Sequence, residues 1–243
     1  MTIAGRFEAA LVEEAAPDLS GPELLPVRLA RACARTLRVD DAGLSLLDPD
    51  DYRVPLGASS DEAAAAERLQ FTVGAGPCTA AQQTRQPVFA VEEELRRRWP
   101  AFTDLLFRAT SYRAVVALPL PSALAGAGAI DLYFRRPDDV PALDVFEALA
   151  VGELVSSALS EAAVWSSGSP AEGPAWLQGP APRRRATVWE AVGKVSVDLE
   201  VGIPAALDLL RACAYAGGRT TEDVAADLLA GRLQPVDLRP AAG

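Results

Sequence analysis

The sequence predicts an α+β domain followed by a small three-helix bundle, and three observations lead to this fold class. Half of the 243 residues are hydrophobic and 23% are charged, the balance of a globular chain with a substantial core. Strand-like apolar runs occur before residue 166 and are absent from residues 183–243. A segment rich in proline, glycine and serine, residues 166–182, separates the two parts.

The first part, residues 1–165, mixes helical and strand-like patterns. Gly43–Leu47 and Tyr52–Ser59 flank the turn signal DPDD at 48–51 and predict a β-hairpin. Further strands are expected at Pro87–Val91, Ala114–Leu120 and Gly128–Arg135, and helices at Glu23–Arg38, Asp61–Gln70, Cys78–Arg85 and Ala101–Thr110. We therefore expect an antiparallel sheet of about five strands with helices packed against it.

A long helix is expected over Pro141–Trp165, with proline in its first turn. One apolar stripe includes Phe146 and Leu154, and a second stripe that includes Leu149 and Val155 lies beside it. This apolar surface is broader than a small sheet covers. We therefore expect a homodimer with this helix near the interface.

Residues 166–182 are expected to form an extended linker, so that proteases cut there and the two parts unfold separately. Trp176 and Leu177 in its middle fit two interpretations. They form a docking point, or Trp176 is an incidental aromatic residue in a poorly ordered segment.

Three short amphipathic helices are expected within residues 183–235, followed by a tail at 236–243. The apolar spacing predicts helices at Thr187–Leu199, Pro204–Ala216 and around Val224–Leu229. Gly217 and Gly218 provide a stop signal for the second helix, and Thr220 with Asp223 resembles a capping pair for the third. Helices this short must pack on one another, so we expect a bundle.

Charge is divided unevenly between the two parts. Residues 1–182 hold 15 arginines and 25 acidic residues, and therefore the whole net charge of −10. Residues 183–243 hold eight cations and eight acids. Because an acidic domain repels a polyanion, any contact with nucleic acid is expected in the C-terminal part.

Several function classes are disfavoured by composition. Histidine is absent, and the three cysteines are far apart, so we expect no catalytic triad, no metal site, no cofactor and no enzyme activity. The most apolar stretch, Leu118–Ile130, is too short to span a bilayer. The first ten residues lack the pattern of a secretory signal, so a cytoplasmic location is expected. Cys78 is expected to be a small buried residue.

Several segments resemble actinobacterial GAF domains, in order along the chain. They are GAGPC at 74–78, RQPV at 85–88, RWP at 98–100, VVALPL at 115–120 and GAIDLY at 128–133. The resemblance covers roughly residues 23–161. It implies a sensor of small molecules or light that is built on a central antiparallel sheet.

Residues 187–233 resemble an ANTAR domain. The matching segments are WEAVGKVSV at 189–197, Ala206-Leu207, LLRA at 209–212, Gly218-Arg219 and Val224-Ala225. The resemblance implies a three-helix bundle that binds paired RNA stem-loops in nascent transcripts and prevents termination. The sequence departs from the family's pattern at Val192, Lys194 and Gly202.

The expected RNA-binding residues are the cations of the second part and one aromatic residue among them: Arg183, Arg184, Arg185, Lys194, Arg211, Tyr215 and Arg219. Arginine can neutralise phosphate, and an aromatic ring can stack on an unpaired base. Alternatively, residues 183–185 are a solvated edge, Tyr215 is a core residue and Arg211 pairs with Asp208 or Asp227.

The ligand of the sensor is not indicated by the sequence. Tyr52, Arg113, Asp131 and Tyr133 are candidates to line its pocket, or they are ordinary residues of a sheet face. The sequence thus predicts a signal-responsive RNA-binding antitermination regulator. The alternative is a ligand-binding or protein-interaction module whose bundle no longer binds RNA.

Overall fold

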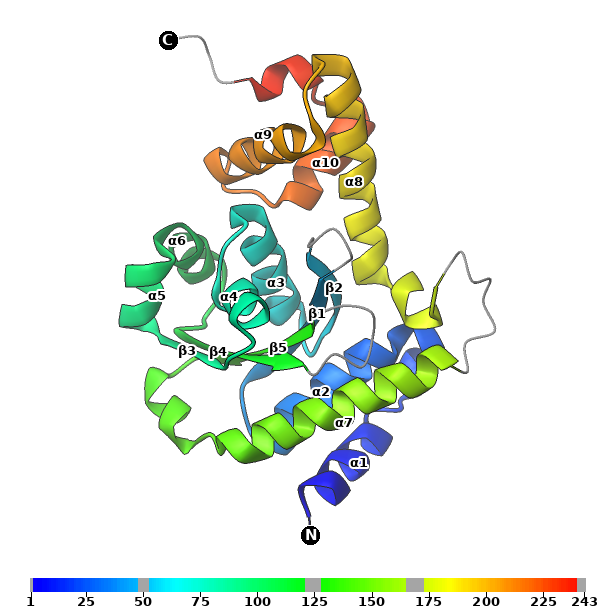
Figure 1. Cartoon of the computed structure of the whole chain (residues 1–243), viewed down its shortest axis with the longest axis vertical. Coiled ribbons are helices and arrows are strands. Elements are labelled where there is room, and N and C mark those ends of the chain that lie inside the picture. Colours follow the sequence, from blue (N-terminus) through cyan, green and yellow to red (C-terminus); the bar gives the residue numbers. More distant parts are fainter. Residues whose placement is uncertain (1, 48–52, 121–127, 165–172, 240–243) are drawn as a thin grey trace.

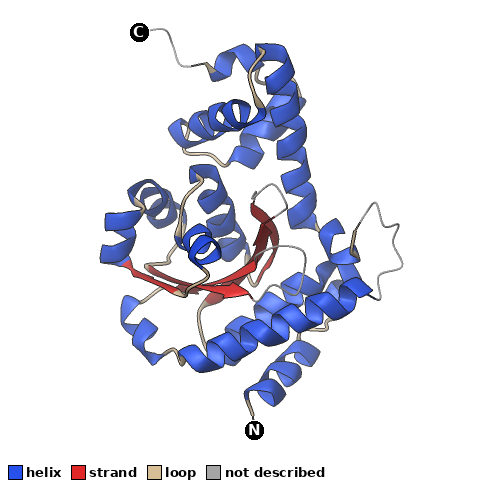
Figure 2. Cartoon of the chain, in the orientation of Figure 1, coloured by secondary structure: helices blue, strands red, loops and turns tan. Residues whose placement is uncertain are grey.

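A five-stranded antiparallel sheet, in the order β2-β1-β5-β4-β3, lies at the centre of the larger part of the molecule (Figures 1 and 2). This computed structural model describes residues 2–47, 53–120, 128–164 and 173–239. The strands are β1 (Asp41–Leu47), β2 (Arg53–Ala58), β3 (Val88–Val91), β4 (Ala114–Leu120) and β5 (Gly128–Phe134). The predicted α+β fold class and the pairing of the expected hairpin strands are confirmed. The turn signal at 48–51 lies outside the described residues.

Helices cover both faces of the sheet (Figure 1). One face carries α3 (Asp61–Val73), α4 (Pro77–Thr84), α5 (Glu92–Arg98) and α6 (Pro100–Ala109). The other face carries α2 (Leu25–Leu37) and α7 (Val145–Val164), and α1 (Ile3–Glu13) packs on these two helices from the side away from the sheet. Because helices lie on both sides, every residue of β5 is buried rather than every second one. One hydrophobic core therefore lies on each side of the sheet.

One helix of the first part was not predicted, and several helix boundaries differ from the sequence prediction. The unexpected helix α5 has glutamates in its first turn and arginines in its last, an arrangement that favours a helix through its dipole. Helix α7 begins at Val145 rather than Pro141, because Asp144 accepts hydrogen bonds from the amides of Phe146 and Glu147. Helix α3 continues three residues beyond Gln70 and ends at Gly74, whose φ of 75° favours glycine.

The C-terminal bundle consists of α8 (Pro180–Leu199), α9 (Ile203–Ala216) and α10 (Thr221–Leu229). Its core is formed by apolar residues at helical spacing, among them Val188, Val192, Leu207, Leu210, Val224 and Leu228. The expected capping pair is present, because Thr220 and Asp223 bond reciprocally to each other's backbone amides. The glycine stop after α9 is also present, at Gly217 and Gly218.

The second half of the expected linker is ordered and packed on the domain that contains the sheet. Trp176 is 2% exposed, and its indole Nε1 donates a hydrogen bond to the Leu159 carbonyl at 3.2 Å. Of the two interpretations of this residue, the docking point is therefore the observed one. The following Pro180–Pro182 form the first turn of α8 instead of linker, because proline fits that position of a helix.

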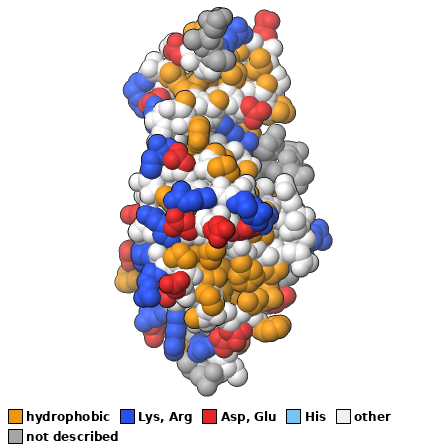
Figure 3. Space-filling view, turned by 90° about the vertical axis from the view of Figure 1, so that its left-hand side faces the viewer, with side chains coloured by type: hydrophobic (Ala, Val, Ile, Leu, Met, Phe, Trp, Pro, Cys, Tyr) orange, Lys and Arg blue, Asp and Glu red, His pale blue; other side chains and the backbone are white. Residues whose placement is uncertain are grey.

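Helix α7 packs against α1, α2 and β4, which cover much of the apolar surface that the sequence predicted. Phe146 and Val164 remain exposed, at 85% and 77%. On the face shown in Figure 3, hydrophobic side chains gather below a band of paired charges. The homodimer stays a prediction. Within the described ranges, the structure contains no helix with the length and apolar character required to cross a membrane.

Candidate functional site

A buried polar cluster lies between the sheet and helices α3 and α4, on one side of the sheet. We call it the inner network: Ser45, Arg53, Glu67, Gln70, Cys78, Gln82, Asp131 and Tyr133. Each of these residues is at most 6% exposed. Buried polar groups are costly unless they are paired, so a buried polar cluster of this size is the first candidate for a functional site.

Arg53 on β2 is the centre of the inner network. Its Nη2 forms ion pairs with Glu67 and, at 3.2 Å, with Asp131. Its Nη1 donates to the Glu67 carbonyl at 2.9 Å, and its Nε lies 3.2 Å from both Ser45 Oγ and Cys78 Sγ. All three nitrogens of the guanidinium group are therefore bonded inside the protein.

The local fold brings α3 close enough to complete these contacts. Gln70 Nε2 donates to Asp131 at 2.8 Å, and its Oε1 accepts from the Cys78 amide at 2.8 Å. A Cβ atom at Gly76 would lie 2.3 Å from Gln70 Oε1, and one at Gly43 would lie 2.3 Å from Glu67 Oε1. Glycine at these two positions permits the close approach of the side chains.

Burial governs the protonation of the inner network. Burial, together with the charge of Glu67, raises the pKa of Asp131 well above its usual range. Burial alone would lower the pKa of Arg53, but the charges of Cys78, Glu67 and Asp131 outweigh it and raise that pKa. Burial therefore opposes the ionisation of Asp131, whereas the neighbouring acidic groups keep Arg53 protonated. Burial also raises the pKa of Cys78, so its sulfur is an unreactive thiol.

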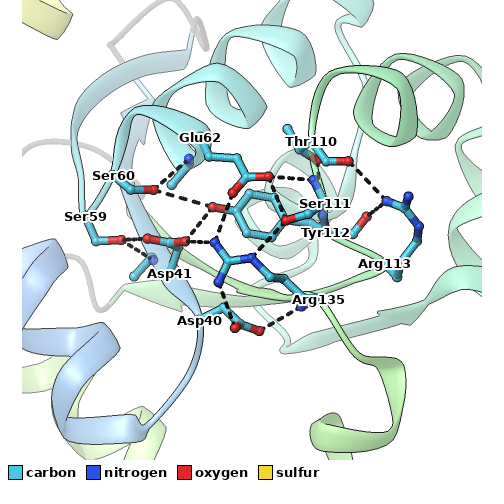
Figure 4. Close-up of polar contacts among 12 residues, drawn as sticks. Asp40, Asp41, Ser59, Ser60, Glu62, Thr110, Ser111, Tyr112, Arg113 and Arg135 are labelled. Atoms are coloured by element: carbon cyan, nitrogen blue, oxygen red, sulfur yellow. Dashed lines mark hydrogen bonds and ion pairs between the residues drawn. The ribbon is translucent and has the colours of Figure 1, made fainter.

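A second polar cluster lies on the same side of the sheet, where β1 begins and β5 ends (Figure 4). We call it the outer cluster: Asp40, Asp41, Ser59, Glu62, Ser111, Tyr112 and Arg135. Arg135 pairs with Asp40 at 2.9 Å and with Glu62 at 3.0 Å. Hydrogen bonds from Ser111 and the charge of Arg135 lower the pKa of Glu62, although its partial burial acts in the opposite direction.

Two tyrosines connect the clusters. Tyr112 donates to Asp41 at 2.7 Å in the outer cluster, and Tyr133 donates to Glu67 at 2.6 Å in the inner network. Their rings stack with centroids 4.7 Å apart. Side-chain contacts therefore run without a break from the outer cluster to Arg53.

The end of α3 contacts the bundle through Phe71. The guanidinium carbon of Arg185 lies 3.1 Å from the Phe71 ring centroid, and that of Arg211 lies 4.8 Å from it. Trp189 meets the same ring edge to face, with centroids 6.5 Å apart. Next to Phe71, Thr72 Oγ1 accepts from the Thr221 amide at 3.0 Å. Phe71 is thus a residue of α3, but its side chain packs in the hydrophobic core of the C-terminal bundle.

In the conformation described here Arg185 is buried and out of reach of an RNA phosphate, which differs from the exposed position that the sequence suggested. It is 1% exposed, pairs with Glu222 at 2.8 Å and donates to the Arg53 carbonyl. Burial lowers the pKa of Arg185 to about 10, although Glu222 acts in the opposite direction, so the group is charged at neutral pH. The physical reason for its position is that a charged group this deep needs a carboxylate partner, and α10 supplies one.

The other expected RNA residues are distributed over the bundle. Arg183 and Arg184 are exposed on the first turns of α8. Lys194 pairs with Asp198 at 2.7 Å, and Arg219 pairs with Asp227 at 2.5 Å. Tyr215 is 41% exposed, so it is not a core residue. Arg211 is half-buried, and its Nε donates to the Phe71 carbonyl at 3.1 Å.

Of the four expected pocket residues, the structure brings two together. Asp131 and Tyr133 both belong to the inner network. Arg113 lies outside it and donates to the carbonyls of Thr110 and Tyr112 (Figure 4). Tyr52 lies outside the described residues.

Sequence reasoning missed Arg53, Glu67 and Gln70. A signal for two of them exists, because Glu67 and Gln70 continue the helical stripe of Ala63 and Ala66, where apolar residues are expected. Arg53 has no such signal. It follows a turn on an edge strand, where an exposed arginine is ordinary.

A cavity of about 540 Å³ lies on the other side of the sheet, between α1, the end of α2 and the start of α7. Its volume falls in the range of small-molecule sites. The lining includes four carboxylates, from Asp40, Asp139, Asp144 and Glu147, and two arginines, Arg6 and Arg38. Three of these carboxylates are paired with arginines, Glu147 with Arg6, Asp40 with Arg135 and Asp139 with Arg136, so the lining does not favour a ligand of either charge.

The chain is similar to GAF domains of known structure. One is the GAF domain of a phosphoenolpyruvate-protein phosphotransferase from Acinetobacter, with a TM-score of 0.45 and 11% identity over 69% of this chain and 96% of that one. Another, from the corresponding protein of Coxiella burnetii, has a TM-score of 0.44 and 13% identity over 65% and 95%. No protein-family model and no curated protein matches the chain.

Proposed function

We propose that the chain is a signal-responsive regulator in which a GAF-like sensor, residues 1–165, controls an RNA-binding bundle, residues 183–235. The order of the two resemblances along one chain supports this proposal. The observation that carries it is that α3 reaches both parts. Glu67 lies in the inner network, whereas Phe71 contacts the bundle one turn later. Because a helix moves as a rigid element, a change around Glu67 alters the contact at Phe71.

The RNA partner in this proposal is a pair of stem-loops in a nascent transcript, whose binding prevents termination. The exposed cations of the bundle would contact phosphate: Arg183, Arg184, Lys194 and Arg219. Residues 1–182 carry the whole net charge of −10 and repel RNA, so the sensor cannot supply these contacts.

The signal in this proposal is a small molecule, and the cavity of about 540 Å³ has the volume to hold one. We further propose that the chain acts in the cytoplasm as a homodimer joined near α7, where Phe146 and Val164 are exposed. Light scattering at micromolar concentration should then give a mass above the 25.5 kDa of one chain. The proposal assigns the chain no catalytic step.

A filter-binding titration with a dual-hairpin RNA tests RNA binding. With about four phosphate contacts, the slope of log affinity against log salt should be about −3 to −4. Changing Arg183 and Arg184 to alanine should flatten the slope by about 1.4 to 1.8. The matched control changes Arg96 and Arg97, two exposed arginines on α5 of the sensor, and should leave the slope unchanged. Binding no tighter than that of an acidic control protein at low salt would refute the proposal.

A second candidate function is an assembly module. The bundle exposes Val197, Ile203 and Val236 at 77%, 43% and 63%. Two of its cations, Lys194 and Arg219, are already paired with acids. If the chain fails to bind RNA but self-associates, and Val197→Asp abolishes this association, the bundle joins proteins rather than RNA.

A further inference from the structure

The Phe71 ring occupies a slot in the bundle that has the chemistry of a base-binding site. Two guanidinium groups, from Arg185 and Arg211, lie against the ring, and Trp189 meets it edge to face. All three of these side chains belong to the bundle, whereas the ring belongs to the sensor. A flat aromatic group from outside the bundle therefore fills a space lined by arginine and tryptophan.

An unpaired RNA base matches the same space. It has a flat π-face for the guanidinium planes and for the indole, and it has polar edges that arginine can bond. Base stacking on such groups tolerates any sequence, because every base has a π-face. Phe71 offers the π-face alone, without the polar edges.

We propose that Arg185, Trp189 and Arg211 form a slot for an unpaired base of a hairpin loop, and that Phe71 fills it in the conformation described here as a mimic of that base. This inference rests on the proposed RNA-binding function. It adds a site to that function and a means of control. RNA gains the slot only when the end of α3 withdraws from the bundle.

The contacts that hold Phe71 in place join the end of α3 to all three helices of the bundle. Arg211 Nε bonds the Phe71 carbonyl, Thr72 Oγ1 accepts from the Thr221 amide, and Arg185 bonds the Arg53 carbonyl. The partner of Arg185, Glu222, lies in the bundle itself. Withdrawal of α3 therefore leaves the Arg185–Glu222 pair in place and exposes it to water, where it is screened and phosphate can compete for the arginine.

Two variants of the full chain release the slot without changing any arginine. Thr72→Val leaves the Thr221 amide without its acceptor, and Phe71→Leu removes the ring. Matched controls are Thr103→Val and Phe102→Leu, which are equally buried residues of α6 away from the bundle. Both release variants should speed hydrogen exchange at the start of α10 relative to wild type, and the controls should not.

The released variants should bind the dual-hairpin RNA about tenfold or more tightly than wild type, in line with one additional stacked base. Their salt slope should be steeper by about 0.7 to 1.8, because one or two further phosphates are neutralised. The gain should disappear in the double variant Thr72→Val/Trp189→Leu and for a fully paired duplex, which has no loop base to offer.

The outcomes separate this inference from the function on which it rests. If wild type binds the hairpins and the released variants bind them equally, RNA binding stands and the masked slot is refuted. Exchange that is unchanged in both release variants also refutes the slot, because Phe71 and Thr72 then do not hold the closed form. If wild type and released variants all bind no better than an acidic control protein, the RNA-binding function itself is refuted.

Discussion

The inner network and the outer cluster have similar polar contacts but differ in their exposure to water. Each holds one arginine between carboxylates at one side of the sheet, Arg53 in the first and Arg135 in the second. The Arg53 side chain is 5% exposed, whereas that of Arg135 is 45% exposed. An exposed pair contributes little to stability, because water and salt screen it. A buried pair is costly to break, because a charge is left without a partner. We therefore expect a substitution in the inner network to lower the free energy of unfolding more than one in the outer cluster.

Removal of the central cation of the inner network should have the largest effect. Arg53→Met leaves the Glu67 carboxylate buried and without its cation, and we expect a loss of about 3–5 kcal/mol in the free energy of unfolding. Urea unfolding at pH 7 measures it. The double variant Arg53→Met/Glu67→Gln should recover part of the loss, because no charge is then left unpaired. A loss below about 1 kcal/mol in the single variant would mean that Arg53 contributes no more to stability than an exposed ion pair does.

Protonation of Asp131 should make the difference between the clusters depend on pH. Its folded-state pKa is raised above the usual value of 3.8, so the folded chain binds this proton more tightly than the unfolded chain. The stability gained from this is fully present below about pH 4 and is lost as pH rises through the folded-state pKa, by about 1.4 kcal/mol for each unit of the shift. Asp131→Asn cannot ionise and should lack this loss. The difference between wild-type and variant unfolding curves from pH 4 to pH 8 tests this, and a constant difference contradicts it.

The smallest effect is expected from the outer cluster. Arg135→Met should cost about 1 kcal/mol or less, since Asp40 and Glu62 remain in contact with water and the buried Asp41 keeps the hydrogen bonds that Ser59 and Tyr112 donate to it. The cost should shrink further in 1 M salt, whereas that of Arg53→Met should change little. Parallel urea titrations at low and high salt make this comparison. Equal salt sensitivity of the two variants would remove the distinction between the clusters.

Much of the fold could be predicted from local pattern. The hairpin strands β1 and β2, the strands β4 and β5, and the Thr220–Asp223 cap each have a signal within a few residues. Helix α5 was missed because it buries only Leu95 and therefore has no apolar period. The last turn of α3 was missed for a different reason. Phe71 and Thr72 find their partners on α8, α9 and α10, far away in sequence.

The residues of the candidate site were harder to predict from local pattern than the helices and strands were. Arg183, Arg184 and Arg185 are identical neighbours in sequence, yet only Arg185 is buried. Its position on the inner side of α8 and its partner Glu222 decide this, and neither is visible in a run of three arginines. Asp131 and Tyr133 could be named in advance because alternation along a strand places them on one face. Arg53 is identified only when the sheet has been assembled around it.

The anchor at Trp176 affects how strongly Phe71 competes with RNA for the masked slot. Because this residue fixes the start of α8 to the sensor, a bundle that has released Phe71 stays tethered beside it. A tethered group competes at an effective concentration of about millimolar, whatever the concentration of the protein. Dilution therefore leaves the ratio of closed to open molecules unchanged, whereas a separate inhibitor protein would dissociate. RNA meets the same internal competitor at every expression level, and its apparent affinity is the affinity of the open form multiplied by the fraction of molecules that are open.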